Sequence, residues 1–197
     1  GRSQRTHLAS GVPGTVAGLL LAHEKYGRLD RATVMRPAID LAQHGFPVSF
    51  TLANTLASPW GKRLLTNPAA THYLFRPDGT PWEPGEILRQ RDLAWTLTQI
   101  SDRGANGFYE GPVADRIVAE MKRGHGLITY EDLAAYRAVE RKPVRGTFHG
   151  YEIVSMPPPS SGGVHLIQIL NTLEGYPIGA LGQNSSETIH LMAEAMK

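Results

Sequence analysis

The sequence has no cysteine in any of its 197 residues, and this absence excludes several kinds of chemistry at once. The chain can form no disulfide, offers no thiolate nucleophile and binds no metal through cysteine. Hydrophobic residues make up 41% of the chain, which is enough for a core that needs no disulfides in a reducing or an oxidising compartment. The missing cysteine therefore leaves the compartment open and predicts a globular protein stabilised by packing.

Long apolar runs and an excess of one charge are also missing. The longest apolar stretch, around residues 16–22, is far too short to cross a bilayer, and no segment resembles a signal peptide. Lys and Arg number 20 against 18 Asp and Glu, and the two signs are interleaved. The densest basic stretch consists of Arg137, Arg141, Lys142 and Arg145 and contains an acidic residue. We interpret it as a solvated face and expect no nucleic-acid partner.

The usual catalytic signatures are absent as well. The chain contains no GxSxG elbow, no phosphate-binding glycine loop that ends in GK and Ser or Thr, and no HExxH. None of the histidines shows metal-ligand spacing, and the paired acids Glu131 and Asp132 are explained by helix capping. The sequence therefore predicts no metal site, no cofactor and no acid and base pair.

A serine nucleophile is the one catalytic alternative that the residues leave open. Ser160 or Ser161 precedes His165 by four or five positions at the start of a predicted helix. This spacing shows only that the groups are near one another, and a hydroxyl at a helix start is more often a cap. We therefore interpret both serines as capping residues.

Helical periodicity dominates the first part of the chain. One helix is predicted over about residues 14–26, and a second follows the N-cap candidate Asp30 and stops at Gly45. Pro37 lies inside this second helix and removes a hydrogen-bond donor, which predicts a break near Arg36.

Residues 51–85 mix short helical patches with Pro and Gly turn signals and are predicted to form a loop-rich surface. Regular helices then return, one ending at Gly104 and one from Pro112 to Gly124. Thr129 is a predicted N-cap for a short acidic-led helix that follows it.

The period of the pattern then changes from helix to strand. Residues 144–148 and 151–155 alternate as strands do, with His149 and Gly150 as a two-residue hairpin turn. A helix over about 164–173 is apolar around most of its circumference and is predicted to be buried.

The junction between the second strand and this helix is the most informative segment of the chain. Prolines cannot continue a sheet ladder, whereas hydroxyls and glycines suit a helix cap and a close backbone approach. The junction reads PPPSSGG and consists of Pro157, Pro158, Pro159, Ser160, Ser161, Gly162 and Gly163.

Several segments together resemble the large subunit of the γ-glutamyltranspeptidase family of N-terminal nucleophile hydrolases. They are, in order, THLASGVPGTVAGLLLAHEKYG (6–27), PAIDLAQHGFPV (37–48), FYEGPVADRIVAEM (108–121), GLITYEDLAAYRAVERKPV (126–144), YEIVSMPPPSSGGVHLIQILNTLEGY (151–176) and HLMAEAMK (190–197). Since these segments span nearly the whole chain, we expect residues 1–197 to be a single segment of that subunit.

The resemblance implies a fold and a chemistry. The expected fold class is α+β, the helix-rich part of an αββα sandwich that is incomplete without the small subunit. In this family the threonine at the new N-terminus of the small subunit attacks a γ-glutamyl amide such as that of glutathione, and the acyl-enzyme is transferred to water or to an amine. The threonine's free amine serves as its base and backbone donors stabilise the oxyanion, so no separate histidine is required.

This sequence departs from the family's catalytic pattern. Thr6 and Thr71 each precede a histidine, but neither begins the TTHYSV-like segment that carries the nucleophile. Arg2 and Arg5 do not belong to the DxRE-like motif that binds the substrate's α-carboxylate. We therefore expect no catalytic residue in this segment, assign no substrate-binding residue, and interpret the PPPSSGG junction as a structural family marker.

The resemblance also implies partners and a compartment. Because the chain opens on Gly1 and closes on Lys197 inside a helical run, we expect an excised piece that is inactive alone. Its expected partners are the small catalytic subunit of the same precursor and a γ-glutamyl small molecule, and the isolated piece is expected to self-associate. The family's usual location implies a periplasmic or secreted protein.

Two other interpretations stay open. One is a related cephalosporin-acylase-like or poly-γ-glutamate-transferring hydrolase, because this segment lacks the pocket residues that would separate these activities. The other is a non-catalytic binding module that kept the scaffold after it lost the catalytic half.

Overall fold

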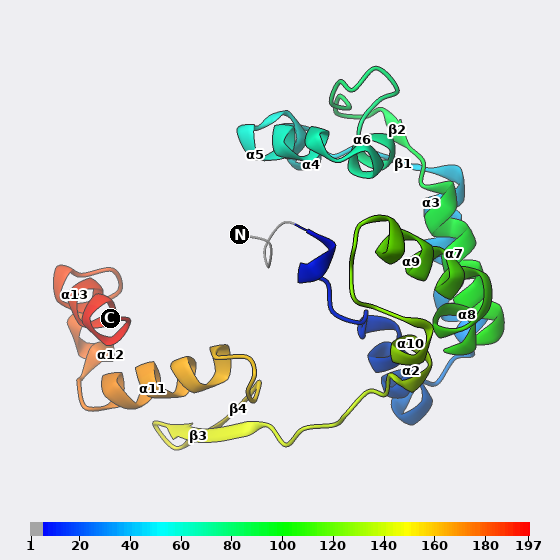
Figure 1. Ribbon diagram of the computed structural model, residues 1–197. Coiled ribbons are helices and arrows are strands. Elements are labelled where there is room, and N and C mark those ends of the chain that lie inside the picture. Colours follow the sequence, from blue (N-terminus) through cyan, green and yellow to red (C-terminus); the bar gives the residue numbers. More distant parts are fainter. Residues whose placement is uncertain (1–5) are drawn as a thin grey trace. The chain divides into compact units, whose positions relative to one another are not determined.

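The computed structural model describes residues 6–197, and its internal contacts divide the chain into two compact units. Unit 1 extends to Ala138, and unit 2 runs from Val139 to Lys197. Helices outnumber strands in both units, as a helix-rich α+β fold requires (Figure 1).

Unit 1 consists of helices and one very short antiparallel strand pair. Its elements are η1 (His7–Ala9), α2 (Thr15–Tyr26), α3 (Arg31–His44), β1 (Phe46–Pro47), α4 (Phe50–Ala57), α5 (Pro59–Lys62), η2 (Arg63–Thr66), α6 (Pro68–Leu74), β2 (Ile87–Leu88), α7 (Arg91–Arg103), α8 (Asn106–Tyr109), α9 (Gly111–Arg123) and α10 (Tyr130–Ala135). In the strand pair, Phe46 faces Leu88 and Pro47 faces Ile87.

Helix α3 begins where the sequence predicts but does not break. The Asp30 carboxylate accepts a hydrogen bond from the Thr33 amide at 2.8 Å and caps the helix. The predicted interruption near Arg36 is wrong, because the helix continues through Pro37 to His44. Helix α3 packs along α7, and this tertiary contact compensates for the one hydrogen bond that proline cannot make.

The predicted loop-rich surface over residues 51–85 is wrong for its first part. Short helices occupy residues 50–74, and the hydroxyl or amide oxygens of Ser49, Ser58 and Asn67 cap three of them. Each cap satisfies amide groups that a helix start leaves without partners. The second part, residues 75–86, is a loop with turns as predicted.

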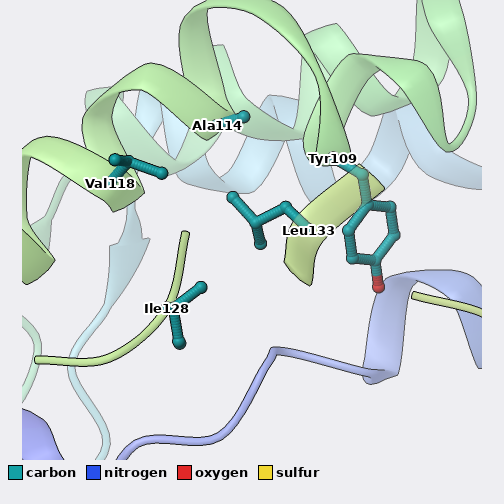
Figure 2. Close-up of a cluster of buried hydrophobic side chains, with 5 residues drawn as sticks. All are labelled: Tyr109, Ala114, Val118, Ile128 and Leu133. Atoms are coloured by element: carbon teal, nitrogen blue, oxygen red, sulfur yellow. The ribbon is translucent and has the colours of Figure 1, made fainter. Parts of the chain in front are cut away.

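The main core of unit 1 lies where α8, α9 and α10 meet. Figure 2 shows its five buried members, with Leu133 in the middle of the group. The helix that carries Leu133 starts with a capping box, in which Thr129 and Asp132 bind each other's backbone amides. The predicted cap at Thr129 is therefore confirmed, and it places Leu133 in the core with 0% exposure.

Unit 2 is a hairpin followed by three helices. The elements are β3 (Val144–Phe148), β4 (Tyr151–Ser155), α11 (Gly162–Glu174), α12 (Ile178–Leu181) and α13 (Ser186–Ala195). The strands are antiparallel with Val144 opposite Ser155, and the turn residues His149 and Gly150 both have positive φ. The predicted hairpin turn is thereby confirmed, since a two-residue turn of this kind requires left-handed backbone.

Helix α11 packs on this hairpin but is not buried in the structure. Only Gly163 and Leu173 of the helix are buried, whereas Leu166 is 44% exposed. The expectation of a buried helix is wrong for this chain, because a two-stranded hairpin and α13 cover only part of its circumference.

Candidate functional site

The candidate site is the junction of residues 157–163, which connects β4 to α11. The chain leaves the sheet after Ser155, and the Pro158–Pro159 peptide bond is cis. The Arg141 guanidinium donates a hydrogen bond to the Pro158 carbonyl at 3.3 Å. The segment that leads into β3 is therefore attached to the loop that leaves β4.

The serine hydroxyls at the helix start differ in what they do. Ser161 is the N-cap residue of α11, but its side chain makes no capping hydrogen bond. The capping role expected of this side chain is therefore not seen, because Ser161 has helical backbone angles that leave its hydroxyl out of reach of the first amides. The Ser160 hydroxyl instead accepts a hydrogen bond from the Gly162 amide at 3.3 Å.

Gly163 is buried at the most crowded point of the junction. A Cβ added here would overlap the Met156 carbonyl oxygen and lie 2.8 Å from Cγ2 of Val144. The backbone of α11 therefore lies directly against Val144 of β3 and against Met156, the residue that follows β4, which only glycine allows. The close backbone approach expected from the two glycines is present at Gly163, while Gly162 has ordinary space around it.

The junction does not assemble a recognisable nucleophile. Within residues 6–197, neither the Ser160 nor the Ser161 hydroxyl bonds to the His165 side chain, and His165 is exposed; the one bond between Ser161 and His165 joins their backbones at the start of α11. No group of three or more His, Asp or Glu side chains suited to a metal ion occurs among the described residues. The geometry fits a rigid connection between sheet and helix.

The largest perturbation of a carboxyl group lies elsewhere, at Glu120 in unit 1. Its carboxylate accepts hydrogen bonds from the Arg123 guanidinium at 2.7 Å and from His7 Nε2 at 2.7 Å. These bonds, with Arg123 contributing most, lower the pKa of Glu120 to about 2. So weak a base is poorly suited to proton transfer near neutral pH. The cluster of His7, Glu120 and Arg123 therefore fits a structural role, in which it connects the start of the chain to α9. His7 and Glu120 are 113 residues apart in the sequence, and no sequence pattern links them.

The other residues singled out in the sequence have local roles. Thr6 caps η1, and the Thr71 hydroxyl donates to the Asn67 carbonyl. In the basic stretch, Arg137 donates to backbone carbonyls and Arg145 pairs with Glu152. Arg2 and Arg5 lie outside the described residues.

Comparison with known proteins decides the family. The sequence profile described as gamma-glutamyltranspeptidase matches residues 1–197. The chain belongs to the γ-glutamyltranspeptidase family. The predicted resemblance is thereby confirmed along its full length.

Relatives of this γ-glutamyltranspeptidase chain include glutathione hydrolase, acylase and capsule biosynthesis proenzymes. It is 46% identical to the glutathione hydrolase proenzyme of Escherichia coli K12 over 196 residues, which cover 100% of this chain and 34% of the relative. It is 43% identical to the acylase ACY 1 proenzyme of Pseudomonas sp. strain SE83 over 189 residues, 96% of this chain and 34% of the relative. The chain thus spans about a third of these longer proenzymes.

Solved structures confirm the fold class. The Helicobacter pylori γ-glutamyltranspeptidase matches with a TM-score of 0.92 and 46% identity, covering 98% of this chain and 55% of that one. The chain therefore has the α+β fold of the corresponding part of that enzyme. Within residues 6–197, no helix is long and apolar enough to span a bilayer.

Proposed function

We propose that this chain is an internal part of the large subunit of an enzyme that cleaves γ-glutamyl amide bonds, such as that of glutathione. The enzyme would transfer the γ-glutamyl group to water or to an amino acid or peptide acceptor. The observation that carries the proposal is the family match along all 197 residues. The enzyme's threonine nucleophile would come from a small subunit of the same precursor, and the protein would be periplasmic or secreted.

In this proposal the PPPSSGG junction supports the scaffold and performs no chemistry. The rigid contacts of Gly163 and the Arg141 bond to Pro158 support a structural role. Among the described residues neither serine hydroxyl bonds to the His165 side chain, which argues against an internal serine nucleophile.

We propose that the small subunit packs on the exposed apolar surface of unit 2 and buries it. That surface includes Tyr151, Met156, Leu166 and Ile189, which are between 44% and 74% exposed. Surfaces of this kind mark contacts with other chains. We therefore expect the isolated chain to self-associate, and light scattering that reports a monodisperse monomer would count against this.

The proposal is tested with a chromogenic γ-glutamyl anilide. The purified 197-residue chain should release no p-nitroaniline, whereas the complete precursor should release it. Ser160→Ala and Ser161→Ala in the complete precursor should keep most of the activity, because neither residue reacts with substrate. If either substitution abolishes turnover while the subunits still form, an internal serine mechanism replaces this one.

The acylase name of one relative supports a second candidate substrate class. Identity of 43% to the acylase proenzyme is close to the 46% found for the glutathione hydrolase. The second candidate activity is hydrolysis of the acyl side chain of a β-lactam. The complete enzyme should be assayed with glutathione and with an acylated cephalosporin, and the ratio of the two kcat/KM values decides between them.

A further inference from the structure

Unit 1 contains an open, largely apolar cavity that the proposed chemistry does not use. It has a volume of about 690 Å³ and lies between residues 10–13, α7 and α9. Its apolar wall is formed by Phe108, Val113, Ile117, Met121 and Ile128. A cavity of this size, with few polar groups, has the character of a small-molecule site.

One cation at this cavity is held in place without a carboxylate partner. The Arg116 guanidinium lies 4.0 Å from the centroid of the Trp95 ring, and both residues line the cavity. Within residues 6–197, the Arg116 side chain makes no hydrogen bond or ion pair. Stacking fixes the plane of a guanidinium and leaves the N–H donors at its edge free to bind an anion.

The carboxylates around this pair are already engaged elsewhere. Asp92, three residues before Trp95, accepts a hydrogen bond from Tyr73 at 3.1 Å. Asp115, adjacent to Arg116, accepts one from Tyr130 at 3.0 Å. Glu120, which also lines the cavity, is bound by Arg123 and His7. Each of these carboxylates thus has a hydrogen-bond partner other than Arg116, and none of them forms an ion pair with its guanidinium.

We propose that this cavity binds a small carboxylic acid with an apolar, preferably aromatic, body. The carboxylate would bind the free N–H edge of Arg116, and the apolar body would lie against Trp95, Phe108 and Ile117. A planar guanidinium binds a carboxylate through two parallel hydrogen bonds, which gives the site a preference for acids over their neutral analogues.

The test compares naphthoate with naphthamide, which share a ring system but differ in charge. Isothermal titration calorimetry on the purified protein should show naphthoate binding at least roughly tenfold more tightly than naphthamide, as expected when a charged hydrogen-bonded pair is replaced by a neutral one. Arg116→Met should abolish this preference. Arg116→Lys should keep part of it, because the charge remains and the planar fork is lost.

The matched control is Lys122→Met, which removes an exposed cation from the same helix at a position outside the cavity. It should leave naphthoate binding unchanged, and circular dichroism should show all variants folded. The proposal is overturned if naphthoate fails to bind, if acid and amide bind equally, or if Arg116→Met and Lys122→Met weaken binding to the same extent.

Discussion

The two units of the chain differ most in how much apolar surface they bury. Unit 1 contains all but one of the buried hydrophobic residues among those described, including Leu133 at 0% exposure. In unit 2 the only such residue is Leu173, at 7% exposure. The strands of unit 2 are nevertheless longer than those of unit 1, five residues against two. Regular secondary structure in unit 2 is therefore not accompanied by a core of its own.

This difference indicates which unit needs contacts with further polypeptide for its stability. A two-stranded hairpin with one packed helix is only marginally stable in water, whereas helices around a closed core stabilise themselves. Under the proposed function, unit 1 supplies its own stability and unit 2 completes its core with chain beyond these 197 residues. Since all three tryptophans, at positions 60, 82 and 95, lie in unit 1, their fluorescence reports on that unit alone.

The largest effect is expected from Leu133→Ala in unit 1. Removing a fully buried leucine from the cluster in Figure 2 should lower the free energy of unfolding by about 2–5 kcal/mol, through lost burial and a residual cavity. Urea denaturation followed by tryptophan fluorescence measures the change.

The matched control for this prediction is Leu166→Ala in unit 2. Leu166 is 44% exposed, so its truncation should change the tryptophan transition by less than about 0.5 kcal/mol. Equal losses at the two positions would show that unit 2 shares the core of unit 1, and the contrast between the units would fail.

A smaller effect is expected from Gly163→Ala at the junction. The new Cβ would overlap the Met156 carbonyl oxygen, which belongs to the backbone and cannot rotate away. Overpacking of this kind costs about 1–3 kcal/mol. Hydrogen exchange of the α11 amides should accelerate, while the tryptophan transition of unit 1 should stay in place.

Gly162→Ala is the neighbouring control, since a Cβ there would be 3.5 Å from the Ser160 hydroxyl, an ordinary contact. This substitution should leave the hydrogen-exchange rates of the α11 amides close to those of the parent chain. A Gly163→Ala variant that shifts the tryptophan transition as well would show that the two units unfold together.

Local signals in the sequence predicted much of the fold. Asp30 and Thr129 cap helices as their side-chain chemistry requires, and His149 with Gly150 forms the hairpin turn. These features depend on a few adjacent residues, so a single sequence contains what is needed to find them. The caps of the helices between residues 50 and 74 were equally local, but the abundance of proline and glycine hid them.

Features that depend on tertiary contact were not predictable. The continuity of α3 through Pro37 depends on its packing along α7, and the exposure of α11 depends on which chain covers it. The same holds for the candidate site. The sequence located the junction, but it could not show that any side chain at position 163 would overlap the Met156 carbonyl oxygen. The pair of His7 and Glu120 joins residues too far apart for any spacing rule.

The smallest effect is expected from Glu120→Gln, and it should depend on pH. The pKa of Glu120 is lowered from 4.5 to about 2 in the folded chain. A depressed carboxyl pKa contributes stability that is fully present above pH 4.5 and is lost as the pH falls toward 2. Because the side chain is 45% exposed, the loss at neutral pH should be about 1 kcal/mol or less.

The stability difference between parent and Glu120→Gln, measured by tryptophan fluorescence, should therefore be largest at neutral pH and shrink below pH 4.5. Glu194→Gln is the control in unit 2, where Glu194 pairs with Lys197 three residues on. It should not change the tryptophan transition at any pH, because it lies outside the unit that tryptophan reports. If the stability difference between parent and Glu120→Gln stays constant between neutral and acid pH, the bonds of Glu120 to His7 and Arg123 do not depend on its charge. The contribution of Glu120 to the stability of unit 1 would then come from packing alone.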